Sequence, residues 1–137
     1  MNKLVHRLAV CGAVVVGAAL APAAVASAEV TVPFQVNPTP YGNPNGSVDS
    51  PPGNCAVVVG EKPGIARVTG FNSGCYLISA VRWLNLSTGA SGTSPMSDGL
   101  FGLPHEAVVP SGPGQVALVG VPFAPTTVPG FATFDVP

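Results

Sequence analysis

Charged residues are scarce in this chain of 137 residues, since five lysines and arginines and six acidic residues make up only 8% of it. Binding to nucleic acid depends on many contacts between basic side chains and phosphates, so a nucleic-acid partner is not expected. The same scarcity argues against electrostatic attachment to anionic lipid. Charge composition therefore excludes two common classes of partner.

Residues that carry out catalysis are also few, and outside the first 28 residues the one histidine is His105. His105 and Glu106 form the one catalytic-looking pair, but neighbouring residues of a strand point to opposite faces. A serine hydrolase would need a turn of the form Gly-x-Ser-x-Gly, which the sequence lacks. One histidine and two cysteines provide too few ligands for zinc. We predict no enzyme activity, no metal and no cofactor.

Paired carboxylates of the kind used in glycoside hydrolysis are not excluded by the sequence alone. Asp49, Asp98 and Asp135 each lie near a turn. Aspartate is favoured in turns because its side chain bonds to nearby backbone groups, so we predict a turn role for each.

Residues 1–28 have the pattern of a helical signal peptide. Lys3 and Arg7 precede an uncharged apolar run, Pro22 interrupts it, and Ala26-Ser27-Ala28 offers small residues to a signal peptidase. We predict cleavage after Ala28 and a secreted or envelope-associated product. The alternatives are cleavage after Ala26 and an uncleaved anchor, for which the apolar run is almost long enough.

Two cysteines, Cys55 and Cys75, remain after the predicted cleavage, while Cys11 lies within the leader. In an exported protein an isolated pair of cysteines indicates a structural disulfide. The closed loop of about 21 residues would contribute roughly 3 kcal/mol in the chain-entropy model. We therefore predict a Cys55–Cys75 bridge rather than a redox or metal-binding pair.

No helical period occurs after the leader, and short apolar runs alternate with turns rich in glycine and proline. Such a pattern predicts an all-β fold, a small antiparallel β-sandwich of seven or eight short strands. The expected strands cover 29–36, 55–59, 65–69, 75–86, 90–95, 105–109, 115–121 and 131–136. We divide the mature domain, 29–137, into an edge strand and loop at 29–54 and a sandwich body at 55–137.

The stretch 75–86 is expected to be the central strand, because it is apolar on both faces and contains no glycine or proline. It includes Trp83, the only tryptophan, which we expect to pack in the core near the disulfide. Loops are better candidate sites for binding a ligand or partner than this central strand, because binding residues are often found on loops. The candidates for contact with an apolar ligand or a partner are Leu100, Phe101 and Leu103, and the loop 37–54 is a second candidate region.

Two Asn-x-Ser sequences, at Asn45 and Asn85, match the acceptor for N-glycosylation. They would matter only in a eukaryotic secretory pathway. Asn85 also falls within the expected central strand, a poor position for a glycan.

The leader, the single cysteine pair and the segment 81–92 resemble small exported proteins of mycobacteria and related actinobacteria. The resemblance rests on Trp83, Asn85, Thr88, Gly89 and Gly92, which match a hairpin pattern W-x-N-x-x-T-G-x-x-G. It implies an immunoglobulin-like sandwich and brings no catalytic residue, because most of these proteins have no established activity.

Together these patterns predict a secreted, non-enzymatic structural or interaction module of the envelope or extracellular space. The alternative is a carrier for an apolar small molecule or lipid. In composition the chain resembles exported actinobacterial sandwiches that hold hydrophobic chromophores. After cleavage no stable membrane anchor is expected, and an envelope protein, a host protein or an apolar ligand would be the partner.

Overall fold

The computed structural model of the protein describes residues 28–41, 53–70, 75–99 and 105–137. The strands of these ranges are β1 (Val30–Pro33), β2 (Thr39–Pro40), β3 (Cys55–Lys62), β4 (Ile65–Gly70), β5 (Ile78–Asn85), β6 (Ser91–Pro95), β7 (Ala107–Val109), β8 (Gly114–Pro122), β9 (Thr127–Val128) and β10 (Phe131–Val136). Each expected strand is present, which confirms the prediction of an all-β fold. The described ranges contain no helix, and hence none long and apolar enough to cross a membrane.

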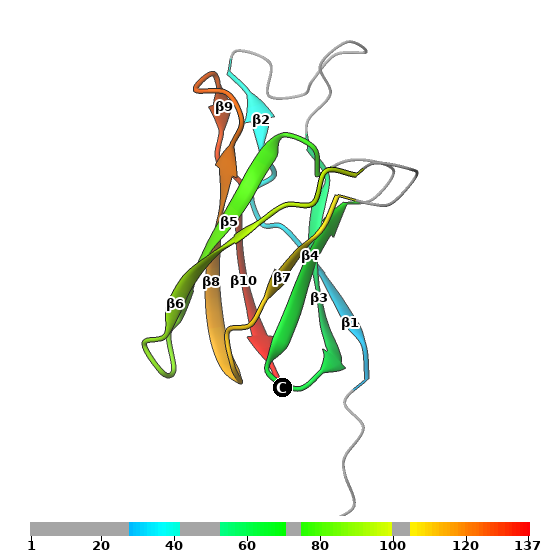
Figure 1. Cartoon of the computed structure of the whole chain (residues 1–137), viewed down its shortest axis with the longest axis vertical. Helices are drawn as coiled ribbons and strands as arrows, with labels where there is room; N and C mark the ends of the chain where they lie inside the picture. The colour runs from blue at the N-terminus through cyan, green and yellow to red at the C-terminus, as the bar shows by residue number, and fades with distance from the viewer. Residues whose placement is uncertain (1–27, 42–52, 71–74, 100–104) are drawn as a thin grey trace, which may run out of the picture.

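The described strands form two four-stranded sheets and a two-stranded ladder (Figure 1). One sheet has the order β1-β3-β4-β7, the other has the order β10-β8-β5-β6, and β2 pairs with β9. All these pairs are antiparallel, as predicted. Figure 1 shows the two larger sheets as layers, with the chain passing between them several times.

The space between the layers is filled by apolar side chains from both sheets. β3 and β4 contribute Val57 and Val68, while β5 and β8 contribute Val81 and Leu118, and all four are fully buried. Valine is the commonest residue of this core, because β-branched side chains fit the pleated surface of a sheet. One face of each sheet is consequently committed to the core, and the other face is available for contacts.

The disulfide between Cys55 and Cys75 is present, as predicted. Cys55 begins β3 in the first sheet, whereas Cys75 lies three residues before β5 in the second. Both cysteines are fully buried. The bridge therefore ties together the ends of two strands that belong to different layers.

The predicted central strand is shorter than its apolar run, since β5 begins at Ile78 and residues 75–77 form a turn. A register shift at Ser79 interrupts its pairing with β8. Because of this bulge, Ile78 and Val81 both point into the core, although strict alternation predicts opposite faces for them. From Val81 onward the alternation holds.

The predicted edge strand at 29–36 is divided between the two sheets. β1 pairs with β3 as far as Pro33, and Val36 then forms an isolated bridge with Phe131 of β10. Phe34 still donates its N–H to the carbonyl oxygen of Cys55, the first residue of β3, and the chain then crosses to the other sheet. The crossing places Gln35 beside the free edge of β10, where its side chain bonds to the backbone N–H and C=O of Thr133.

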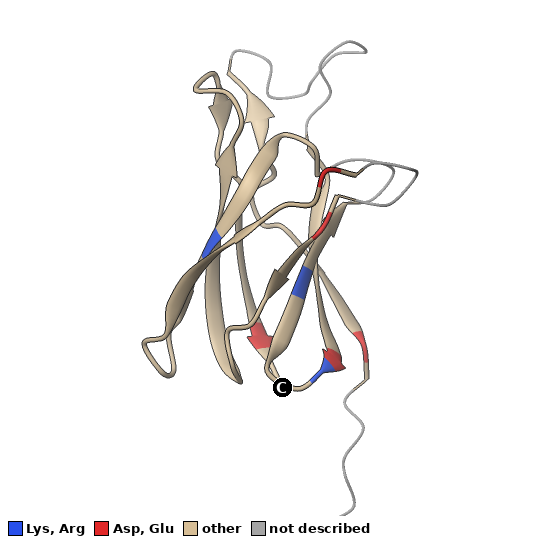
Figure 2. Ribbon diagram, viewed as in Figure 1, with Lys and Arg blue, Asp and Glu red and all other residues tan. Residues whose placement is uncertain are grey.

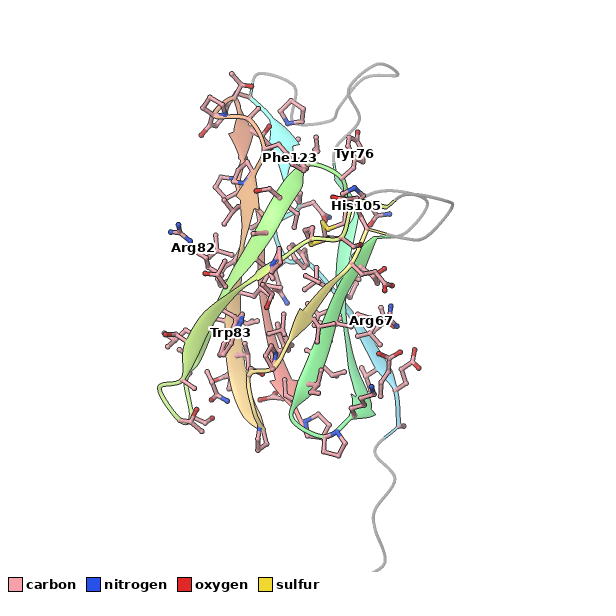
Figure 3. All side chains as sticks on the ribbon, viewed as in Figure 1. Arg67, Tyr76, Arg82, Trp83, His105 and Phe123 are labelled. Atoms are coloured by element: carbon pink, nitrogen blue, oxygen red, sulfur yellow. A yellow bond between two sulfur atoms is a disulfide. The ribbon has the colours of Figure 1, made fainter. Side chains whose placement is uncertain are left out.

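The ladder of β2 and β9 was not expected from the sequence. Both strands have two residues and lie in proline-rich segments that lack apolar alternation. Patterns of hydrophobicity cannot reveal such a ladder, because it depends on two distant segments meeting. Figure 1 shows the ladder at one end of the molecule, and Figure 3 shows the sulfur atoms of the disulfide in the half of the molecule nearer that end.

Candidate interaction surface

The outer face of the β10-β8-β5-β6 sheet exposes large apolar side chains. Three strands and the turn after β5 contribute four side chains that are between 37% and 52% exposed: Leu84 of β5, Leu86 of the turn, Val119 of β8 and Phe131 of β10. We call these four residues, together with the Arg82 among them, the apolar face. Exposed apolar side chains that gather on one sheet are typical of an interaction site, whereas scattered ones are not.

Strand pairing places these residues in rows across the sheet. Phe131 is paired with Val119, and Val119 with Arg82. The next row joins Leu84 to Ala117 of β8 and Thr133 of β10. The apolar face is therefore continuous across three strands, and it is built on regular structure rather than on loops.

The apolar face arises from the alternation of β5 after its bulge. Val81, Trp83 and Asn85 point inward, so Arg82 and Leu84 must point outward. Figure 3 shows Arg82 projecting away from the second sheet, while Arg67 projects from the opposite side of the molecule. Arg82 and Leu84 are both exposed, and so is Leu86 in the turn that follows β5.

Among the described residues, two charged ones lie on the outer side of this sheet, and they have opposite signs. Arg82 is on β5 and Asp135 is on β10, as the single blue and single red segment of this sheet in Figure 2. Both are exposed, and neither makes an ion pair with another described residue. These charges are thus available to a partner.

The outer side of the first sheet is different, because its charges neutralise one another. Arg67 donates hydrogen bonds to Glu61 and Glu106, and Thr69 also donates to Glu106. The hydrogen bond with Arg67 holds the pKa of Glu61 below its ordinary value of 4.5. The hydrogen bond to Glu61 also raises the pKa of Arg67. We assign this cluster a structural role.

The pair His105-Glu106 does not form a catalytic arrangement in the described residues. Glu106 is engaged by Arg67, and the His105 ring lies against Gly99 with its Nδ1 atom buried and unpaired. Among the aspartates, Asp98 is exposed in a segment without regular structure, Asp135 lies in a strand rather than a turn, and Asp49 is outside the described residues. The described residues contain no group of three His, Cys, Asp or Glu side chains placed to hold a metal.

A second group of exposed apolar side chains lies at the disulfide end of the molecule. Tyr41, Tyr76 and Phe123 are 62%, 37% and 65% exposed. Figure 3 shows Tyr76 and Phe123 at this end, near the ladder of β2 and β9. The predicted contact residues Leu100, Phe101 and Leu103 lie outside the described residues, as do residues 42–52 of the predicted loop.

Trp83 packs against the core, as predicted, but away from the disulfide. Its ring lies beside Gly92 of β6, where a Cβ atom would come within 2.5 Å of Cζ2 of the indole. Figure 3 shows the sulfur atoms well above Trp83. The expected contact with the disulfide is therefore wrong, because the turn at 75–77 and the length of β5 separate the two.

Asn85 is fully buried and joins two turns. Its Nδ2 atom donates to the carbonyl oxygens of Ser111 and Pro113, and its Oδ1 atom accepts from the backbone N–H groups of Ser87 and Thr88. A side chain held in this way has no free amide for a glycan.

Two grooves follow the open sides of the layers. One, of about 390 Å³, lies between β1 and β10 and is lined by valines 30, 32, 59 and 136 together with Asp135. The other, of about 490 Å³, lies between β6 and β7 and includes Met96 and Glu106. The first groove has the apolar lining that a small hydrophobic ligand requires.

Comparison of the chain with protein-family models, with curated proteins and with solved structures gives no match. Function therefore has to be argued from the surfaces described above.

Two residues of the apolar face, Val119 and Phe131, were not identified as candidates from the sequence. Their exposure could have been expected from the alternation within β8 and β10. Their position beside Arg82 could not, because it depends on which strands pair.

Proposed function

We propose that this protein is an exported, non-enzymatic interaction module that binds its partner through the apolar face. The observation that carries the proposal is the row Phe131–Val119–Arg82, which is exposed and crosses three strands. Apolar and aromatic side chains around one arginine have the composition of the centre of a protein interface. The scarcity of basic residues makes nucleic acid a poor partner.

Export is part of the proposal, and it rests on the leader pattern of residues 1–28 together with the disulfide. Disulfides persist mainly in oxidising compartments outside the cytosol. Mass measurement of the protein from the culture medium should give a chain that begins at Glu29 and has no free thiols. A mass that includes the leader would contradict the proposed cleavage after Ala28.

Membership of the immunoglobulin-like sandwiches is also a proposal. The order β10-β8-β5-β6 corresponds to the order G-F-C-C′ of variable-type immunoglobulin domains. In the other sheet, β3 and β4 form a hairpin, whereas the immunoglobulin order ABED has no hairpin at that place. The likeness is thus best supported for the sheet that carries the apolar face.

Site-directed photo-cross-linking tests the proposed surface. A photoreactive benzoylphenylalanine at Val119 should give a defined adduct in the cells that produce the protein. The matched control places the same residue at Val108, a valine of the opposite sheet that is 58% exposed. Adducts at both positions, or at neither, would refute a role for the apolar face.

Transport of an apolar small molecule is the second candidate, and the groove between β1 and β10 favours it. Its volume of about 390 Å³ suits a ligand of moderate size. Native mass spectrometry of the protein from its own medium should then show a bound mass that organic extraction removes. Val59→Glu should abolish that bound mass, and a protein without any bound mass would eliminate this candidate.

A further inference from the structure

We propose that the apolar face binds the same face of a second copy of this chain, with Arg82 of each copy paired with Asp135 of the other. The inference rests on the proposed function and names the partner of that surface. It is carried by two charges of opposite sign on the outer side of one sheet, Arg82 within the apolar face and Asp135 beside it, neither of which pairs with another described residue.

The positions of the two charges satisfy the symmetry of a homodimer. Arg82 and Asp135 are separated by four residues in the direction of the strands. Across the sheet they are separated by two strand spacings, from β5 over β8 to β10. These steps correspond to about 13 Å and about 10 Å for ordinary sheet geometry. Ala117, in the middle row on β8, lies halfway between the two charges.

A twofold axis can therefore lie in the plane of the face, over Ala117 and at right angles to the line from Arg82 to Asp135. Rotation about this axis brings each arginine opposite the aspartate of the other copy. Such an interface is isologous, because the same patch contributes from both sides. The small side chain of Ala117 at the centre lets the two sheets approach closely.

The apolar face should bind a second copy of the chain better than it binds an uncharged apolar surface, because a second copy offers partners for both charges. Covering Arg82 with an apolar surface would remove it from water without a partner, which is unfavourable. In the homodimer both charges gain partners, while Leu84, Leu86, Val119 and Phe131 are removed from water. One patch thus supplies both the apolar area and the complementary charges.

The edge of the sheet at β10 is covered by residues 35 and 36 of the same chain. A second copy is therefore more easily bound through the apolar face than by adding a strand at this edge. The Gln35 side chain bonds to the N–H and C=O of Thr133, and Val36 bonds in the same way to Phe131. A second chain therefore meets no unpaired backbone at these residues.

Sedimentation equilibrium of the exported protein tests the inference, at concentrations up to about 1 mM to include weak association. The mass should rise to that of a dimer. Arg82→Glu and Asp135→Arg should each weaken dimerisation at least about tenfold, since each brings like charges together. Combining both substitutions restores opposite charges and should restore the dimer.

Lys62→Glu is the control, because Lys62 is exposed on the other sheet. It should leave the dimer unchanged, and circular dichroism should show all variants folded. A monomer at every concentration, or a double variant no better than the single ones, would overturn the inference.

The cross-linking at Val119 separates the two levels of failure. An adduct with twice the mass of the chain agrees with the homodimer. An adduct with another protein overturns the homodimer and leaves the proposed function standing, while the absence of any adduct removes both.

Discussion

At the scale of single residues, Asn85 shows how a polar side chain can be required inside this core. Buried polar groups are costly unless they are hydrogen-bonded, and its amide bonds to backbone groups of two separate turns. The hairpin pattern in the sequence contains this asparagine for a physical reason. The glycine of the same turn, Gly89, has a φ of 78° and donates its N–H to the carbonyl oxygen of Asn85.

Replacing Asn85 with alanine should therefore lower the free energy of unfolding by about 3 kcal/mol, because several backbone groups lose their partners. Urea denaturation of the purified protein measures this difference. The matched control is Asn54→Ala, since Asn54 is exposed and its replacement should cost little. Equal stability of the two variants would show that Asn85 does not hold the turns together.

The ion pair of Glu61 with Arg67 makes a pH-dependent contribution to stability. Hydrogen bonds from Arg67 hold the pKa of Glu61 below 4.5, so the folded state binds the proton less readily than the unfolded state. The contribution is therefore present above the unfolded pKa and is lost as the pH falls through the lowered folded value.

Glu61→Gln should accordingly be less stable than the wild type at neutral pH. The difference should begin to shrink as the pH falls below the unfolded pKa of about 4.5, and it should vanish below the lowered pKa of the folded state, where the folded carboxylate is protonated as well. Thermal unfolding at a series of pH values tests this expectation. A difference that stays constant down to pH 2 would contradict it.

At the scale of elements, the pairing of β5 with β6 depends on a close contact between Trp83 and Gly92. No side chain larger than hydrogen fits at Gly92, since a Cβ atom would lie 2.5 Å from the indole ring. The Nε1 atom of Trp83 is buried without a hydrogen-bond partner, so the ring is held here by packing alone. The space beside the indole ring therefore decides which residues are tolerated at position 92.

Gly92→Ala should lower the free energy of unfolding by about 1–3 kcal/mol, the usual cost of overpacking. In a Trp83→Ala background the same substitution should cost little, because the ring that it meets is gone. A double-mutant cycle of denaturation measurements gives the coupling between the two sites. Additive effects would show that Trp83 does not restrict position 92.

The strands also show what patterns of hydrophobicity can predict and what they cannot. These patterns located every described strand of the two four-stranded sheets, because glycine and proline separate the short apolar runs. They did not locate the bulge at Ser79 or the division of the first strand at Pro33. Both depend on which strands lie alongside, and that information is not contained in a local pattern.

At the scale of the whole molecule, the disulfide joins the two layers at one end. Replacing both cysteines with alanine should lower the free energy of unfolding by roughly 3 kcal/mol in the chain-entropy model. Urea denaturation of the double variant beside the oxidised wild type measures this. Reduced wild type should resemble the variant, and an unchanged urea midpoint would contradict the prediction.

The candidate surface could be predicted only in part. Arg82 and Leu84 share β5, so alternation alone puts them on one face, and Leu86 directly follows that strand. Val119, Phe131 and Asp135 come from strands more than 30 residues further along the chain. The order of the strands brings them together, and many orders are compatible with the same pattern of strands.

By itself the sequence determined the class of fold, the positions of the strands in the two larger sheets and the pairing of Cys55 with Cys75. These properties follow from local alternation, from glycine and proline between strands, and from having two cysteines after residue 28. The tertiary structure alone decided which side chains are left exposed next to one another. Pairing across the sheet sets that arrangement, and it put Arg82 and Asp135 on the outer side of the same sheet.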